Sequence, residues 1–430
     1  MTIKEIYQAY QQCEGVSTDT RNLWSGAMYV ALKGPNFDGN QFLNQALKAG
    51  ARYCISDDPH KQGDSIIKVE NTLDTLQKLA TYHRRQWTIP VVGLTGSNGK
   101  TTSKELLYAV LSQKYRVGYT QGNLNNHIGV PLTILNLPVN SEIAIIEMGA
   151  NHQQEIAQLS AIAEPDYGFI TNYGKAHLEG FGGVEGIIKG KSELYDYLRK
   201  HQKTAWINCA DAKQKEKSAG IEKRYFFGDC PDAQFPIKPA PLSDRGTVCI
   251  SLNQTIINSH LTGGYNFSNL AIAAAMGQFF EVPLANIQKG LENYQPHNNR
   301  SQLEQVGTNV LIRDYYNANP DSMEGAIFNL LELKAQGKWV ILGDMFELGE
   351  STTEEHQKIV NLLSSNSIEK VILIGEAFAG THGPGMRFNT TKEAATYLQN
   401  NLPERKTILL KGSRSMQLEK VAYVLENASL

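Results

Sequence analysis

The stretch that most constrains the fold is VVGLTGSNGKTTSKELL, residues 91–107. A short run rich in β-branched residues precedes a glycine-rich turn, and the apolar residues that follow recur at helical spacing. Strand, turn and helix in this order form the unit of a parallel α/β sheet, which binds ligands at the carboxyl ends of its strands. Leu94, however, stands where the common phosphate-binding loop has its first glycine.

Such a loop binds phosphate through backbone N–H groups that lie beside the positive end of the following helix. Gly96 and Gly99 would allow the close approach of the backbone. Lys100 would reach the β- and γ-phosphates, and the Thr101 hydroxyl would hold Mg²⁺. The alternative is an ordinary strand-to-helix turn. We predict a nucleotide-binding loop formed by Thr95, Gly96, Ser97, Asn98, Gly99, Lys100, Thr101 and Thr102.

Length and charge limit the class of protein. A chain of 430 residues is too long for one ordinary core, so we expect two or three domains. The net charge of −2 gives no bulk attraction to nucleic acid or to anionic membranes, and we expect neither as a partner. The N-terminus has no apolar signal segment and no later run is long enough to span a membrane, so we expect a cytoplasmic protein.

The five cysteines are scattered and include no C-x-x-C pair. This pattern predicts reduced thiols, with neither a disulfide framework nor a zinc site. The cysteines are Cys13, Cys54, Cys209, Cys230 and Cys249.

The pattern of expected strands and helices is interrupted at two places, around Pro90 and in the segment NYQPHNNR. We predict domains at residues 1–88, 89–296 and 297–430. Strands alternate with helices in the last unit, from VLIRDYY to the helix SMQLEKVAYVLENA, which favours a parallel sheet. The predicted fold class is α/β, with a smaller N-terminal α/β domain, a central P-loop-type, mostly parallel sheet with helices, and a Rossmann-like C-terminal α/β domain.

Glu147 closes a second apolar strand, EIAIIEMG. A carboxylate at the carboxyl end of a strand beside a phosphate loop suits a hard cation such as Mg²⁺. A lone glutamate at such a place is more often simply solvated, so the neighbouring segments must decide its role.

The form TGSNGKTT resembles the ATP loop of the Mur ligases, cytoplasmic enzymes that add amino acids to the peptidoglycan precursor, and of the related folylpolyglutamate synthetases. Three later segments resemble the same family: EMGA at Glu147, NYGKAHLEGFG at His177 and GKSELY at Lys191. The resemblance implies ATP and two Mg²⁺ ions, held by Thr101, Glu147, His177 and Lys191. It also implies that Lys191 is carbamylated, so that its ammonium becomes a bridging carboxylate.

The segment GGYNFSNLAIAAA resembles the family motif whose asparagines contact adenine, here Asn266 and Asn269. Their spacing of three places them on one helical face. Arg300 takes the place of a family arginine that binds ATP phosphates, and Asp314 that of a ribose-binding aspartate. The chain departs from the family pattern at three places: Tyr265 stands for a histidine, Asn299 for a glycine and Arg313 for an aspartate.

The string YNANPDSM, residues 316–323, resembles the Mur ligases that join D-alanyl-D-alanine to UDP-N-acetylmuramoyl-tripeptide. The implied reaction is ATP-dependent amide formation through an acyl phosphate. The oligomeric state is left open by the sequence, and we expect a monomer by default. Its implied catalytic residues are Lys100, Glu147, His177, Lys191 and Arg300. The candidates for contact with the dipeptide are Asn317, Asn319, Lys411 and Arg414. The candidates for contact with the UDP-substrate are Ser17, Thr18, Lys33, Asn125 and Asn126.

Two other functions share some of these features. A folylpolyglutamate synthetase would carry the loop and the lysine but has no reason to carry YNANP. A nucleotide-binding regulator would carry the loop but would not need Glu147, His177 and Lys191 together. The sequence leaves open the third residue of the tripeptide, lysine or diaminopimelate, and the general base for the amine.

Overall fold

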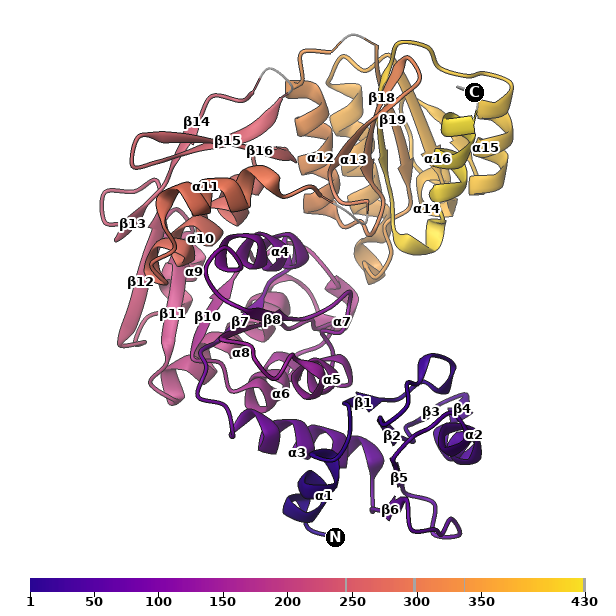
Figure 1. The fold of residues 1–430 in the computed structure, drawn as a ribbon. Helices are drawn as coiled ribbons and strands as arrows, with labels where there is room; N and C mark the ends of the chain where they lie inside the picture. Colours follow the sequence, from indigo (N-terminus) through magenta and orange to yellow (C-terminus); the bar gives the residue numbers. More distant parts are fainter. Residues whose placement is uncertain (244–245, 297–298, 336, 428–430) are drawn as a thin grey trace.

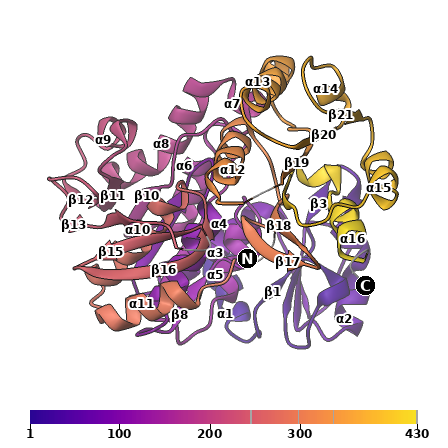
Figure 2. The same ribbon diagram turned by 90° about the horizontal axis from the view of Figure 1, so that it is seen from above.

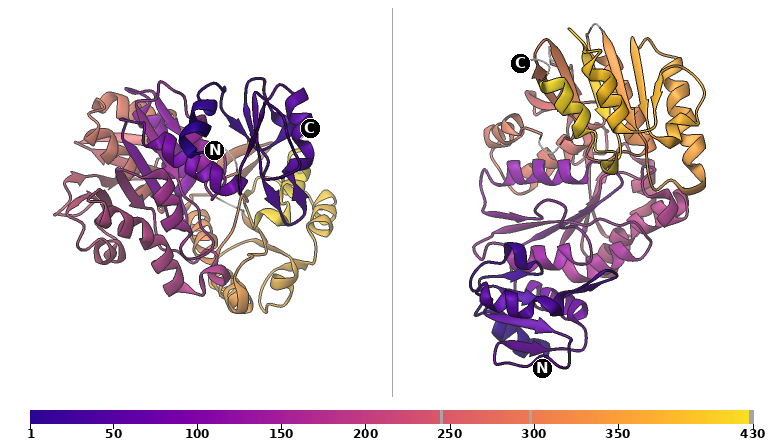
Figure 3. Two further views of the ribbon diagram at one scale, coloured as in Figure 1. Left: turned by 90° about the horizontal axis from the view of Figure 1, so that it is seen from below. Right: turned by 90° about the vertical axis from the view of Figure 1, so that its right-hand side faces the viewer.

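The computed structural model describes residues 1–243, 246–296, 299–335 and 337–427. These residues form three α/β domains, with the N-terminal and C-terminal domains at opposite ends of the middle domain (Figure 1). The side view in Figure 3 shows the same order along the long axis of the molecule. The predicted fold class is confirmed. No helix within these ranges is long and apolar enough to cross a membrane.

The N-terminal domain contains a small parallel sheet with the strand order β1-β2-β5-β6. Met28 and Val30 belong to the core formed with α1 and α3, whereas Tyr29 packs with α2, as the alternation of a strand requires. The elements are α1 (Ile3–Tyr10), β1 (Val16–Ser17), η1 (Thr20–Asn22), β2 (Met28–Val30), β3 (Lys33–Gly34), β4 (Phe37–Asp38), η2 (Gly39–Phe42), α2 (Leu43–Lys48), β5 (Tyr53–Ser56), β6 (Ile66–Lys68) and α3 (Thr72–Arg84).

The middle domain is built on a parallel sheet with the order β13-β12-β11-β10-β7-β9-β8. Apolar residues of α4, α10 and α11 cover one face, and those of α5, α6 and α8 cover the other. The elements are β7 (Val91–Thr95), α4 (Lys100–Leu111), β8 (Val117–Tyr119), α5 (Gly129–Asn136), β9 (Ile143–Glu147), α6 (Glu155–Ala163), β10 (Tyr167–Ile170), α7 (Leu178–Phe181), α8 (Val184–Lys200), β11 (Thr204–Asn208), α9 (Ala212–Lys217), β12 (Lys223–Gly228), β13 (Phe235–Pro236), β14 (Lys238–Ala240), β15 (Thr247–Leu252), β16 (Thr255–Thr262), α10 (Asn266–Phe279) and α11 (Leu284–Asn293).

The C-terminal domain has the strand order β17-β18-β22-β19-β20-β21, in which β17 alone is antiparallel to its neighbour within the described residues. Helices α12 and α13 cover one face and α15 and α16 the other (Figure 2). The elements are β17 (Gln302–Val306), β18 (Asn309–Asp314), α12 (Pro320–Glu332), β19 (Lys338–Gly343), η3 (Gly349–Ser351), α13 (Thr352–Ser364), β20 (Lys370–Ile374), α14 (Glu376–Ala379), β21 (Met386–Phe388), α15 (Thr391–Gln399), β22 (Thr407–Lys411), η4 (Arg414–Met416) and α16 (Glu419–Asn427).

The predicted strand, turn and helix of the phosphate loop are confirmed as β7 and α4. The predicted alternation of strands and helices in the last unit is also confirmed, and the unit further contains β17, α14, β21 and α15, which were not predicted. The second predicted domain boundary adjoins residues 297–298, and the last predicted helix extends to residue 428. These three residues lie outside the described ranges.

The expectation of five reduced cysteines is wrong for two of them, because Cys209 and Cys230 form a disulfide. Cys209 follows β11 and Cys230 follows β12, and these neighbouring parallel strands pair Asn208 with Phe227 in register. The two cysteines therefore meet at one edge of the sheet, with their Cα atoms 6.0 Å apart. A separation of 21 residues gives no local pattern that would reveal this pairing.

Candidate active site

The phosphate loop begins two residues later than the common pattern. Leu94 is fully buried in β7, where it pairs in register with Glu147 of β9 and Phe169 of β10. The position that requires glycine is Gly96, whose φ is 146° and where a Cβ would lie 1.9 Å from Thr171 Oγ1. Leu94 is thus part of the hydrophobic core and not of the turn.

Lys100, the first residue of α4, bends back over the loop. Its Nζ donates to the carbonyl oxygens of Gly96 at 2.6 Å and Ser97 at 3.1 Å. Burial lowers the pKa of Lys100 to about 8, a shift that Glu147 opposes and Arg300 increases. The ammonium therefore lies where the loop would receive phosphate oxygens.

Glu147 ends β9 beside this loop and is 1% exposed. Its Oε1 accepts from Asn125 Nδ2 at 2.8 Å and from the Thr101 hydroxyl at 3.4 Å. Its Oε2 lies 3.4 Å from Lys104 Nζ and has no hydrogen-bond partner. A buried carboxylate oxygen without a hydrogen bond suits a hard cation, and the neighbouring Thr101 hydroxyl is a second oxygen donor of the same kind.

His177 is the N-cap residue just before α7, and its backbone lies in the left-handed region, with φ at 56°. Its Nδ1 forms a short hydrogen bond with Glu347 Oε2 of the C-terminal domain. Burial lowers the pKa of His177, whereas the Glu347 charge opposes this shift. The described residues contain no group of three or more His, Cys, Asp or Glu side chains arranged for a metal, so the predicted set depends on Thr101 and Lys191 as well.

Lys191 lies on α8 and is fully buried. Its Nζ donates to Ala150 O at 3.0 Å and lies 4.7 Å from the ring centre of Phe181. Burial, together with the charge of Lys100, lowers the pKa of Lys191 well below its usual value. This lowered pKa favours the neutral amine, which is the nucleophilic form that carbamylation requires.

Asn266 and Asn269 share one face of α10, as their spacing predicts. Asn269 Nδ2 donates to Asn266 Oδ1 at 2.8 Å, and Ser103 Oγ donates to Asn269 Oδ1 at 2.9 Å. Tyr265, which replaces the family histidine, hydrogen-bonds through its hydroxyl to Ser301 Oγ at 2.7 Å. This contact joins the middle domain to the C-terminal domain next to Arg300.

The guanidinium of Arg300 lies 3.9 Å from the ring centre of Tyr316, and its buried Nε has no hydrogen-bond partner. Asn299 precedes it with φ at 55°, a conformation that glycine favours and asparagine tolerates. This explains how asparagine can replace the family glycine. Arg414 lies farther from the same ring, at 5.2 Å.

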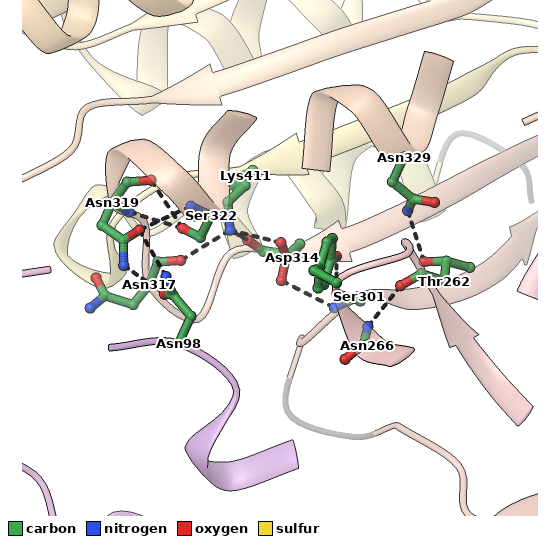
Figure 4. Close-up of polar contacts among 11 residues, drawn as sticks. Asn98, Thr262, Asn266, Ser301, Asp314, Asn317, Asn319, Ser322, Asn329 and Lys411 are labelled. Carbon is green, nitrogen blue, oxygen red and sulfur yellow. Dashed lines mark hydrogen bonds and ion pairs between the residues drawn. The ribbon is translucent and has the colours of Figure 1, made fainter. Parts of the chain in front are cut away.

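Asp314 and Lys411, predicted for different ligands, form an ion pair of 2.7 Å (Figure 4). The other carboxylate oxygen of Asp314 accepts from Ser301 N at 3.1 Å. Lys411 Nζ also lies 3.4 Å from Asn317 O. These residues are thus already joined to one another before any ligand is considered.

A cavity of about 880 Å³ lies between the middle and C-terminal domains. The predicted residues that line it are Ser97, Asn98, Gly99, Lys100, Thr101, Thr102, Asn125, Asn126, Glu147, His177, Asn266, Asn269, Arg300, Asp314, Asn317, Asn319 and Lys411. The predicted residues outside its lining are Ser17, Thr18, Lys33, Thr95, Gly96, Lys191 and Arg414.

Two of the predicted UDP-substrate residues that lie outside the cavity lining are bound to other residues of the N-terminal domain. Ser17 Oγ donates to Asp19 O at 3.1 Å, and Lys33 pairs with Asp57 at 2.9 Å, both in the N-terminal domain.

Sequence reasoning missed Asn172, which lines the cavity and whose Oδ1 accepts from Asn98 N at 3.0 Å. Its place two residues after β10, at the carboxyl edge of the sheet, could have indicated it.

Comparison with known proteins identifies the family to which this chain belongs. The Mur ligase family catalytic domain matches residues 12–84, the Mur ligase middle domain matches residues 94–277, and the Mur ligase glutamate ligase domain matches residues 299–414. A relative from Bacillus subtilis (strain 168) is 34% identical over 97% of this chain and 94% of its own length. The chain belongs to the Mur ligase family.

That relative is named UDP-N-acetylmuramoyl-tripeptide–D-alanyl-D-alanine ligase. A crystal structure of MurF from Acinetobacter baumannii is 31% identical, with a TM-score of 0.87 over 99% of this chain and 98% of that one. MurF ligase from Thermotoga maritima, solved in complex with ADP, is 27% identical, with a TM-score of 0.86 over 98% of each chain.

Proposed function

We propose that this protein joins D-alanyl-D-alanine to UDP-N-acetylmuramoyl-tripeptide with ATP, a step of peptidoglycan precursor synthesis. The observation that carries this proposal is the shared cavity: the loop lysine Lys100, the buried carboxylate of Glu147 and the C-terminal residues Asn317 and Lys411 all line it. ATP, a carboxylate and an incoming amine would therefore meet in one place.

In the proposed reaction, an oxygen of the tripeptide carboxylate attacks the γ-phosphorus, and the bond to ADP breaks. The dipeptide amine then attacks the acyl carbon of the acyl phosphate, phosphate leaves, and the amine gives up a proton. Lys100 and Arg300 would bind the transferring phosphoryl group, because spread negative charge is stabilised by fixed cations. Asn266, Asn269 and Asp314 would bind adenosine after giving up contacts they now make to one another and to Lys411.

Two Mg²⁺ ions would neutralise charge on the transferring phosphoryl group. Thr101, Glu147 and His177 would hold them, and the buried Glu147 Oε2 without a hydrogen bond is the feature that supports this assignment. Lys191 would join them as a carbamate, and the lowered pKa of its amine supports this proposal. In a Lys191→Ala variant, added short carboxylates should restore part of the lost activity; no restoration at any concentration would argue against the carbamate.

The remaining assignments follow from the substrates. Ser17, Thr18 and Lys33 would bind the UDP end in the domain of residues 1–88, with Asn125 and Asn126 nearer the peptide. Residues 89–296 would bind ATP, and residues 297–430 would bind the dipeptide through Asn317, Asn319, Lys411 and Arg414. We propose that the enzyme acts in the cytoplasm, as its ATP and UDP-linked substrates suggest, and that it acts as a monomer.

A phosphate-release assay tests the proposal. Release should require ATP, Mg²⁺, the UDP-tripeptide and D-alanyl-D-alanine together. The UDP-tripeptide with lysine and the one with diaminopimelate as third residue are tested in parallel. Release with folate and glutamate instead would indicate a folylpolyglutamate synthetase. ATP binding without release under any of these conditions would indicate a nucleotide-binding regulator.

A further inference from the structure

The loop between β10 and α7, residues 171–177, connects the phosphate loop with the C-terminal domain. On one side, the Ser97 hydroxyl donates to Gly174 O. On the other side, the C-terminal domain approaches so closely that a Cβ on Gly174 would lie 2.7 Å from Asp321 Oδ2. Glycine at this position therefore allows a direct contact between the domains.

Three acidic side chains from separate parts of the C-terminal domain meet this loop. Asp321, in the first turn of α12, accepts from Lys175 N at 2.7 Å. Glu355, on α13, accepts from Lys175 Nζ at 2.9 Å. Glu347, between β19 and α13, hydrogen-bonds to His177 Nδ1. Lys175 is thus bound to the other domain through both its backbone and its side chain.

The pair of Lys175 and Glu355 is partly shielded from water. The side chain of Glu355 is 8% exposed and that of Lys175 is 36% exposed. Burial favours the neutral acid, but hydrogen bonds from Lys175 and Lys358 outweigh it, and the pKa of Glu355 is lowered. Lys358 lies on the same helix as Glu355, so within this charged group only the bond to Lys175 crosses between domains.

We propose that Lys175 is a positioning residue that docks the C-terminal domain and thereby sets the place of His177 beside the phosphate loop. The backbone between these two residues is short, and each of them is bound to the C-terminal domain. A weaker contact at Lys175 would let this segment and the domain move apart. The consequence for turnover rests on the proposed function, whereas the docking contact itself does not.

Hydrogen exchange measures the docking without any substrate, because the Lys175 N–H is itself donated across the boundary to Asp321. We compare a peptide covering residues 172–178 in the wild type and in Lys175→Met, which keeps the backbone amide. Exchange should be about three- to tenfold faster in Lys175→Met, as expected for the loss of one hydrogen bond whose charge interaction is partly screened by water. The matched control is Lys203→Met, because Lys203 pairs at 2.7 Å with Asp166 inside the middle domain and is similarly exposed.

Kinetics tests the consequence. Lys175→Met and Glu355→Gln should each raise the KM for D-alanyl-D-alanine about three- to tenfold with little change in the KM for ATP. The double variant should be no worse than either one, and Lys175→Arg should restore the wild-type value. Unchanged exchange in Lys175→Met would overturn the inference, as would equal effects in Lys203→Met. Absence of ligase activity in the wild type would instead overturn the proposed function and leave the exchange result valid.

Discussion

Asn319 donates its side-chain amide to Asn98 Oδ1 at 2.7 Å, although the two residues are 221 positions apart in the chain. Asn319 is also the N-cap of α12, where its Oδ1 accepts from Ser322 N at 3.0 Å. One side chain therefore starts a helix of the C-terminal domain and touches the middle of the phosphate loop (Figure 4). The two roles can be separated by substitution.

Asn319→Ser keeps a residue that caps helices but is too short to reach Asn98, whereas Asn319→Ala loses both functions. We expect Asn319→Ala to reduce the free energy of unfolding by about 1 kcal/mol and Asn319→Ser to reduce it by much less. Both variants should lower kcat/KM, because the contact to the loop is gone in each. Thermal unfolding and steady-state kinetics measure the two effects, and wild-type kinetics in Asn319→Ser would show that the contact with Asn98 is dispensable.

Removal of the loop lysine should stop the chemistry and leave the fold intact. Lys100→Met should reduce the rate of phosphate release by roughly 10²-fold or more, since a fixed cation at the transferring phosphoryl group is lost. The control is Lys114→Met, just beyond the other end of α4, where Nζ binds the carbonyl oxygens of Phe280 and Glu281, pairs with the Glu281 carboxylate and lies over the ring of Tyr115. A similar loss in both variants would contradict a specific role for Lys100.

Glu147→Gln keeps the shape of the side chain and removes its charge. The Mg²⁺ concentration for half-maximal rate should rise at least about tenfold. The loss of a group that only hydrogen-bonds to a metal ligand already weakens metal binding by about 10- to 100-fold. A magnesium titration of phosphate release measures this shift. Glu142→Gln, which alters the residue just before β9, should show the magnesium dependence of the wild type. An unchanged magnesium dependence in Glu147→Gln would remove Glu147 from the metal site.

His83 should make the protein less stable in acid. Trp87 Nε1 donates to His83 Nε2 at 3.3 Å, so this nitrogen must remain unprotonated, and burial lowers the pKa of His83 to about 4. Between pH 6.5 and 4 the unfolded chain takes up a proton that the folded protein does not, so the free energy of unfolding falls as pH falls through this range. Above pH 6.5 His83 does not make the free energy of unfolding depend on pH.

Urea unfolding at several pH values measures this effect. The change in the free energy of unfolding between pH 6.5 and 4 should be smaller in His83→Phe than in the wild type. It should be unchanged in His60→Phe, which alters an exposed histidine. Equal changes in wild type and His83→Phe would show that another group controls acid stability.

The sequence predicted what depends on neighbours in the chain. Strand β7, the glycine-rich turn and α4 follow from local pattern, and so does the shared face of Asn266 and Asn269. Contacts between distant segments left no such pattern: the disulfide of Cys209 and Cys230 depends on the pairing of β11 with β12. The family resemblance drew attention to Lys191, but only the packing of α8 reveals that its amine is buried.

The acyl phosphate is the central claim, and isotope transfer tests it most directly. The UDP-tripeptide is prepared with ¹⁸O in its terminal carboxylate and is incubated with ATP, Mg²⁺ and D-alanyl-D-alanine. Mass spectrometry should find one ¹⁸O atom in each phosphate released. The product should be heavier than the labelled UDP-tripeptide by the mass of the dipeptide less that of one H₂¹⁸O, with one ¹⁸O retained in the new amide. Amide formation with unlabelled phosphate, or phosphate release without the amide product, would contradict the account.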